Sequence, residues 1–75
     1  MHLKNIFAKR LSQLIKDNKT SKQAVANAIG VSRPAVSQFA SGDNLPSVEK
    51  LVALATYFNV SLDYLVGLSD DPRRR

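Results

Sequence analysis

The sequence predicts an all-α fold, a compact bundle of five short helices that includes a helix-turn-helix. Apolar residues recur at spacings of three and four along most of the chain, which is the spacing of one helix face. Serines suited to helix N-caps and glycines suited to helix ends punctuate this pattern, and no stretch alternates like a strand. We therefore expect helices at about 4–17, 22–29, 33–41, 48–58 and 62–66.

The first two helices are defined by an apolar stripe and by their end signals. Phe7, Leu11 and Leu14 form one stripe along the first helix. Ser21 is a good N-cap for the second helix, and Gly30 ends it because glycine adopts the left-handed conformation at little cost.

The remaining helices follow the same signals. Ser32 caps the third helix, whose first turn tolerates Pro34 because the backbone donors there have no helical partner. Pro46-Ser47 opens the fourth helix, and Ser61 caps a short fifth one that Gly67 ends. Residues 1–68 are thus predicted to form one domain, and residues 69–75 a polar basic tail or linker.

Composition restricts the classes of function that this chain can have. Its 75 residues carry a net charge of +5 and no cysteine, so disulfides and thiolate metal sites are excluded. The basic excess favours a polyanionic partner. No apolar run is long enough to cross a membrane and no secretion signal is visible, so we expect a cytoplasmic protein without membrane contact. With His2 as the single histidine and no convergent catalytic group, we expect neither an enzyme nor a metal or cofactor.

The stretch from Lys22 to Phe39 carries the functional prediction. In a helix-turn-helix the two helices approach closely, so a small side chain is needed at their contact, and Ala26 meets this need. Gly30 follows after four residues, where the turn requires a positive φ. Val36 then anchors the second helix from beneath, which leaves the opposite side of that helix free to enter a DNA groove.

These residues and their neighbours resemble a known family, the Cro/CI-type (XRE) helix-turn-helix repressors of phages and bacteria. The resemblance covers roughly residues 4–68 and lies above all in three runs with Gly42 and Pro46: residues 21–26, 29–33 and 36–39. It implies a lambda-repressor-like five-helix domain, bacterial or phage-encoded, that binds operator DNA as a dimer and regulates transcription, usually as a repressor.

Two departures from the family pattern have structural consequences. The family often pairs an arginine on the first helix with an acid at the end of the third, where this chain has Ile15 and Ala40. Because apolar pairs often replace buried ion pairs without loss of stability, we expect these two side chains to pack together. At the start of the second helix the family commonly has glutamine, whereas Lys22 stands here and supplies a point charge for a phosphate.

The predicted DNA contacts fall into two groups. Base contacts are expected from the exposed face of the third helix, at Arg33, Pro34, Ser37 and Gln38. An arginine pairs well with guanine and a glutamine with adenine, although Arg33 can also be read as a phosphate contact or a solvated helix end. Phosphate contacts are expected from the following residues: Ser21, Lys22, Ser41, Asn44 and Ser47.

The C-terminal part of the chain suggests a partner subunit. Leu62, Tyr64, Val66 and Leu68 are more apolar than a short terminal helix requires. They either cap the core or form the two-fold interface of a homodimer. A dimer would place two recognition helices about 34 Å apart, in successive major grooves of a palindromic operator.

One other class of function remains open from sequence alone. Antitoxin-like and adaptor domains also use a helix-turn-helix, with another protein as the main partner. Such a domain is expected to expose an apolar cluster, whereas the third helix here has a polar outer face.

Overall fold

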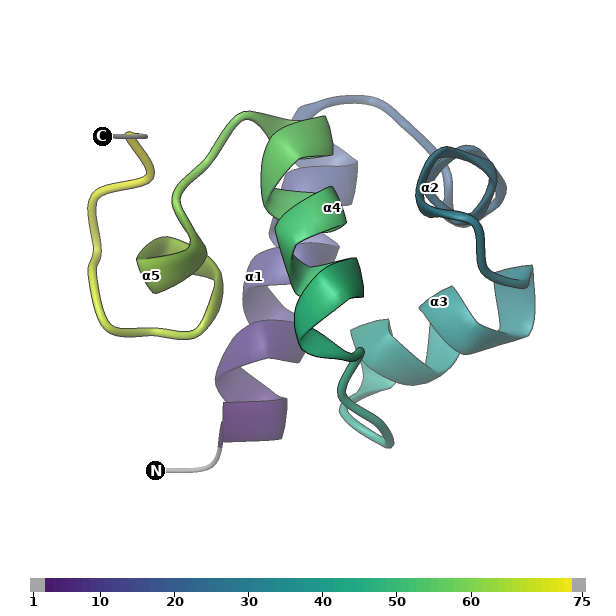
Figure 1. The fold of residues 1–75 in the computed structure, drawn as a ribbon, viewed down its shortest axis with the longest axis horizontal. Coiled ribbons are helices and arrows are strands. Elements are labelled where there is room, and N and C mark those ends of the chain that lie inside the picture. The colour runs from purple at the N-terminus through teal and green to yellow at the C-terminus, as the bar shows by residue number, and fades with distance from the viewer. Residues whose placement is uncertain (1–2, 74–75) are drawn as a thin grey trace.

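The computed structural model describes residues 3–73, which form five helices and, within that range, no strand (Figure 1). The helices are α1 (Leu3–Asp17), α2 (Lys22–Ile29), α3 (Arg33–Ser41), α4 (Val48–Phe58) and α5 (Leu62–Leu65). The all-α, five-helix prediction is confirmed. α1 begins one residue earlier than predicted, and α5 ends one residue earlier because Val66 leaves helical geometry as the C-cap.

Serine side chains begin four of the five helices. The hydroxyls of Ser21, Ser32, Ser47 and Ser61 each accept a hydrogen bond from the backbone N–H three residues later, at distances of 3.0–3.3 Å. Each bond satisfies a donor that the first helical turn leaves without a partner, which stabilises the helix by about 1 kcal/mol.

Left-handed residues end three of the helices. Gly30 follows α2 with φ 75° and Gly42 follows α3 with φ 85°. Asn59 closes α4 with φ 57°, a conformation that asparagine tolerates better than most other residues. The sharp ends and short connections turn α2 and α3 away from the direction in which α1 and α4 run (Figure 1).

The core is built from the apolar stripe of every helix. Six large side chains are completely or almost completely inaccessible to solvent: Phe7, Leu11, Val25, Val36, Leu54 and Leu65. The ring of Phe7 meets that of Phe39 edge to face, with 6.5 Å between the ring centroids. Phe7 therefore joins α1 directly to α3.

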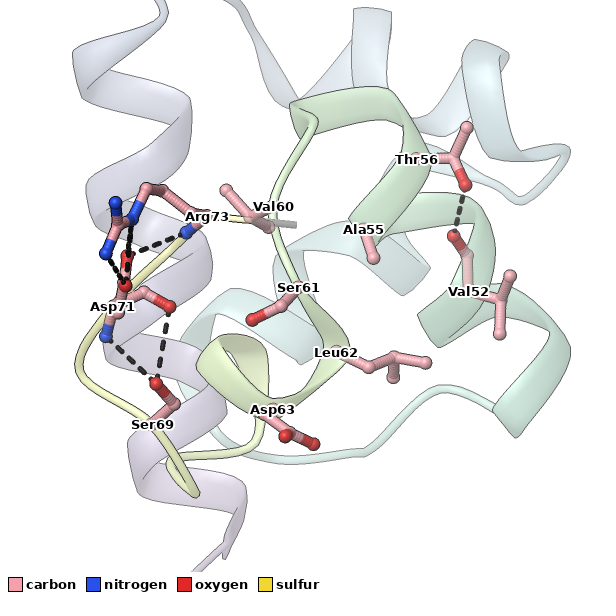
Figure 2. Close-up of a pocket in the computed structure, with 10 residues that line it drawn as sticks. All are labelled: Val52, Ala55, Thr56, Val60, Ser61, Leu62, Asp63, Ser69, Asp71 and Arg73. Carbon is pink, nitrogen blue, oxygen red and sulfur yellow. Dashed lines mark hydrogen bonds and ion pairs between the residues drawn. The ribbon is translucent and has the colours of Figure 1, made fainter. Parts of the chain in front are cut away.

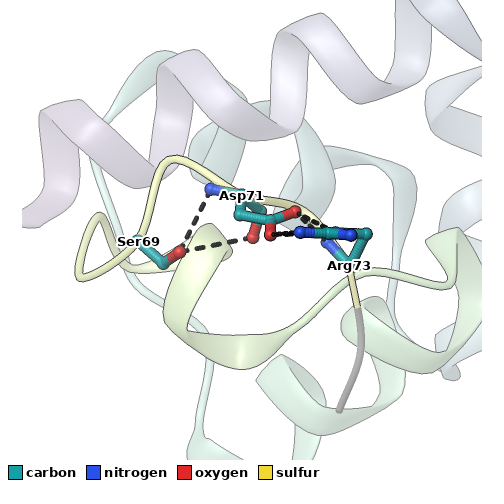
Figure 3. A network of polar contacts seen from close by, with 3 residues as sticks. All are labelled: Ser69, Asp71 and Arg73. Atoms are coloured by element: carbon teal, nitrogen blue, oxygen red, sulfur yellow. Dashed lines mark hydrogen bonds and ion pairs between the residues drawn. The ribbon is translucent and has the colours of Figure 1, made fainter.

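The polar segment 69–73, which the sequence predicts as part of a tail or linker, folds back onto the domain in the structure. The backbone N–H of Ser61 donates to the carbonyl of Pro72 at 3.0 Å. Within the segment, Arg73 pairs with Asp71 at 2.7 Å, and the Asp71 backbone N–H donates to the Ser69 hydroxyl (Figure 3). Residues 74 and 75 of the predicted tail lie outside the described residues.

Arg10 connects this segment to α1 and α5. Its guanidinium stands 4.0 Å from the centroid of the Tyr64 ring and 3.0 Å from a carboxylate oxygen of Asp70. Partial burial opposes the charge, but the contacts with Tyr64 and Asp70 outweigh it and raise the pKa of Arg10 above its usual value. The segment is thus attached at two separate points, by Arg10 and by the backbone of Ser61.

None of the helices between residues 3 and 73 is both long enough and apolar enough to span a lipid bilayer.

Candidate nucleic-acid interface

The turn between α2 and α3 has the geometry that the sequence predicts. Ala26 and Val36 are both fully buried, and Gly30 has the required positive φ. The backbone N–H groups of Gly30 and Val31 both donate to the carbonyl of Ala26, at 2.9 and 3.0 Å. These bonds close α2 and fix the start of the turn, so α3 rests on Val36 and keeps its opposite side outward.

Lys50 on α4 braces this turn, a role that the sequence did not suggest. Its ammonium group donates to the carbonyl of Ile29, the last residue of α2, at 2.9 Å. A cation at a helix C-terminus satisfies a carbonyl that has no helical partner and also interacts favourably with the helix dipole. A lysine near the start of a helix gives no sequence signal for such a role, because its partner is 21 residues earlier.

We expect Lys50→Met to lower the free energy of unfolding by about 1–2 kcal/mol, because it removes a charged hydrogen bond and keeps the aliphatic stem. Chemical denaturation followed by circular dichroism measures the change. Lys9→Met is the matched control, because Lys9 is exposed on α1 and makes no hydrogen bond or ion pair within residues 3–73. Equal effects of the two substitutions would contradict a bracing role for Lys50.

The four predicted base-contacting residues lie on one outward side of α3. Arg33, Pro34 and Gln38 are exposed and Ser37 is half-buried. Ser37 and Gln38 follow Arg33 and Pro34 by four residues each, so the two adjacent pairs lie one helical turn apart on the same side of the helix. Among residues 3–73 the Arg33 guanidinium forms no hydrogen bond or ion pair, so its donors are available to a ligand.

The end of α3 and the following loop form a small polar network. The Ser41 hydroxyl lies 3.1 Å from the Gln38 carbonyl and 2.9 Å from a carboxylate oxygen of Asp43. The side-chain amide of Asn44 donates to the side-chain oxygen of Gln38 at 2.7 Å. Ser41 and Asn44, both predicted to contact phosphate, therefore have partners within the protein, and Asn44 touches a predicted base-contacting residue.

The other predicted phosphate contacts stand at helix N-termini. Ser21 and Ser47 are exposed caps, and Lys22 is the half-buried first residue of α2. Each serine oxygen accepts a backbone hydrogen bond, which leaves its own O–H free to donate to a phosphate. The unpaired backbone N–H groups of these first turns favour an anion as well.

The four predicted dimer-interface residues differ in exposure. Leu62, Tyr64 and Val66 are half-buried, and Leu62 and Tyr64 pack against the core. Leu68 is 79% exposed. Leu62 also lines a groove of about 560 Å³ between α4, α5 and the segment 69–73, together with Val52 (Figure 2). This region thus contains apolar side chains that cover the core, such as Tyr64, and an apolar side chain that is exposed to solvent, Leu68.

The structure places Ile15 and Ala40, the two departures from the family's ion pair, at the edge of the core. Both are half-buried and pack against the core cluster. α1 and α3 are also joined here by the Ser12 hydroxyl, which donates to the carbonyl of Ala40 at 3.3 Å. Direct packing of Ile15 on Ala40 stays a prediction.

Comparison with known proteins agrees with this geometry. The helix-turn-helix family model matches residues 11–65. The chain is 36% identical to the HTH-type transcriptional regulator YobD of Bacillus subtilis, over 89% of the chain and 60% of that protein. It is 40% identical to the cryptic phage CTXphi transcriptional repressor RstR of Vibrio cholerae, over 67% of the chain and 44% of that protein.

A solved structure shows the same arrangement of helices. The crystal structure of a transcriptional regulator from Listeria innocua superposes with a TM-score of 0.78 and 41% identity, covering 81% of this chain and 57% of that one. The chain belongs to the helix-turn-helix family, in its Cro/CI-type (XRE) branch. It spans about half of the length of the curated relatives that it matches.

Proposed function

We propose that this domain binds double-stranded DNA sequence-specifically and regulates transcription as a repressor, with α3 in the major groove. The observation that carries the proposal is the outward polar side of α3, where Arg33 has no protein partner within residues 3–73. The buried Ala26 and Val36 hold α3 in this orientation. The domain acts in the cytoplasm of a bacterium, without catalysis and without a cofactor.

The roles of the individual residues follow from their positions. Arg33 at the start of α3 pairs with the O6 and N7 atoms of a guanine, and Pro34 meets the methyl group of a thymine. Ser37 and Gln38 lie one turn further along the same side. Lys22, with the Ser21 and Ser47 hydroxyls, contacts phosphates and fixes the register of the domain on the duplex.

We further propose that two copies bind a palindromic operator. Leu68 is largely exposed, and Val52, which lines the groove together with Leu62, is 45% exposed. An apolar surface of this kind on a small domain supports a two-fold contact, because burial in a dimer would remove it from water.

Selection of bound sequences from a random duplex pool tests the proposal. We expect a palindromic consensus whose half-sites are separated by about 10 base pairs, one turn of B-DNA. A single unrepeated half-site would contradict the dimer and keep the DNA-binding proposal. Failure to enrich any sequence would overturn specific DNA binding.

Two alanine substitutions separate base contacts from phosphate contacts. Arg33→Ala should lower discrimination at one base pair of each half-site by about 1–3 kcal/mol. Lys22→Ala should weaken binding to all sequences alike and reduce the salt dependence by about one phosphate per domain. Fluorescence anisotropy with matched and mismatched duplexes measures both effects. Equal loss across all sequences for Arg33→Ala would assign Arg33 to the phosphate backbone.

The alternative of an antitoxin-like or adaptor domain has less support. The side of α3 that faces outward is polar, whereas a protein partner would favour an apolar cluster there. The large exposed apolar side chains of the described residues all lie outside α3: Leu3, Val48, Val52, Tyr57 and Leu68.

A further inference from the structure

The side chain of Gln38 is held by a hydrogen bond from the loop that follows α3. Asn44 donates from its side-chain Nδ2 to the Gln38 Oε1 atom at 2.7 Å. Both side chains are exposed, and the Gln38 Nε2 amino group has no hydrogen-bond partner among residues 3–73. The outer side of α3 therefore presents a glutamine whose oxygen is engaged and whose amino group is free.

The backbone of the loop fixes Asn44 in this position. Gly42 turns the chain with φ 85°, and the N–H groups of Asp43 and Asn44 then donate back to the Gln38 carbonyl at 3.0 and 3.4 Å. The Ser41 hydroxyl contacts the same carbonyl. Asn44 is thus tied to residue 38 through its backbone as well as through its side chain, which restricts where its amide can point.

We propose that Asn44 is a positioning residue that sets which base Gln38 recognises, an inference that rests on the proposed function. An unconstrained glutamine reads adenine by accepting from N6 with Oε1 and donating to N7 with Nε2. Asn44 already donates to Oε1 and restricts the plane of the amide, so a second donor at Oε1 adds less than a new bond from Nε2, which has no partner within residues 3–73. Gln38 then favours bases that present hydrogen-bond acceptors and no amino donor in the major groove. These bases are thymine, through O4, and guanine, through O6 and N7.

This assignment gives Asn44 a role different from the phosphate contact that its position in the sequence suggests. A phosphate contact would supply affinity without base preference. A residue that orients Gln38 would change base preference at one position of the operator. The two roles of Asn44 are therefore distinguished by base preference, which measurements of stability do not report.

The first test uses the duplex recovered by the random selection, with the four bases varied at the position that loses discrimination in Gln38→Ala. We expect Asn44→Ala to reduce the preference for thymine or guanine over adenine about fivefold, the value of one net hydrogen bond. The melting temperature should stay nearly unchanged, because the lost bond joins two exposed side chains. In a Gln38→Ala background, Asn44→Ala should change base preference no further.

A second variant reverses the polarity of the contact. Aspartate has no donor, so in Asn44→Asp the Gln38 amide must turn its Nε2 toward residue 44 and its Oε1 toward the groove. The preference should then shift toward adenine or cytosine, whose exocyclic amino groups donate in the major groove. Ser47→Asp is the charge-matched control, because it adds the same charge nearby, can still cap α4 and makes no contact with Gln38. It should weaken all duplexes alike.

The outcomes separate this inference from the proposed function. A wild-type protein that selects no duplex overturns both. A wild-type protein that discriminates bases, together with Asn44→Ala and Asn44→Asp variants that keep the same preference at the Gln38 position, overturns only the role of Asn44. A uniform loss of affinity in Asn44→Ala assigns that residue to the phosphate backbone.

Discussion

Replacing Phe7 with alanine is expected to remove most of the stability of this domain. Phe7 is fully buried, and its ring packs edge to face on Phe39 of α3. Truncation of a buried phenylalanine costs about 3–5 kcal/mol, from lost burial and from the cavity left behind. A domain of this size has a total stability of about 4–11 kcal/mol, so a large share is lost. Urea denaturation of both proteins measures the difference.

Phe7→Leu is the matched control for this substitution. Leucine fills most of the volume of the ring, so we expect a cost of about 1–1.5 kcal/mol. The leucine variant should retain DNA binding at low temperature, whereas the alanine variant should lose binding in parallel with helicity. An alanine variant as stable as the wild type would show that α1 does not support α3 in the way described.

Binding to duplex DNA is expected to fall steeply as salt is added. The chain carries a net charge of +5, and the proposed phosphate contacts are Lys22 and the capped N-termini of α2 and α4. Each phosphate neutralised contributes about 0.9 to the slope of log affinity against log salt. A dimer with six or more such contacts would therefore lose at least about 10³ in affinity between 50 and 200 mM salt. Anisotropy titrations at several salt concentrations give the slope.

The neutral variant Gln23→Ala provides the control for this measurement. Gln23 is exposed on α2 next to Lys22, and its side-chain amide donates to Asn27. Because glutamine is neutral, the substitution changes no charge. The slope should stay at the wild-type value. Binding that is insensitive to salt would argue against phosphate contacts and in favour of a protein partner for this domain.

The features that sequence predicts best are those encoded by neighbouring residues. Ser21, Ser32 and Gly30 act within one or two helical turns, so a helix cap or a left-handed end can be read directly from them. The triad of Ala26, Gly30 and Val36 is equally local, and its geometry is confirmed. The order of the five helices follows from the same signals.

Contacts between distant segments were not predictable in this way. The bond from Lys50 to the Ile29 carbonyl and the clamp of Arg10 on Asp70 join residues 21 and 60 positions apart. In the sequence, Lys50 and Arg10 look like any exposed lysine or arginine, so their partners could not be identified. Asn44 and Gln38 were each expected near DNA, but their mutual hydrogen bond depends on the loop conformation set by Gly42.

The attachment of residues 69–73 by Arg10 and Ser61 has a practical consequence for tethering. These contacts hold the segment 69–73 beside α5, across the domain from α3 (Figure 1). A fluorophore attached to this segment would therefore stand on the α5 side of the domain and not in front of α3. Labels on the segment 69–73 are therefore compatible with single-molecule measurements on long duplexes.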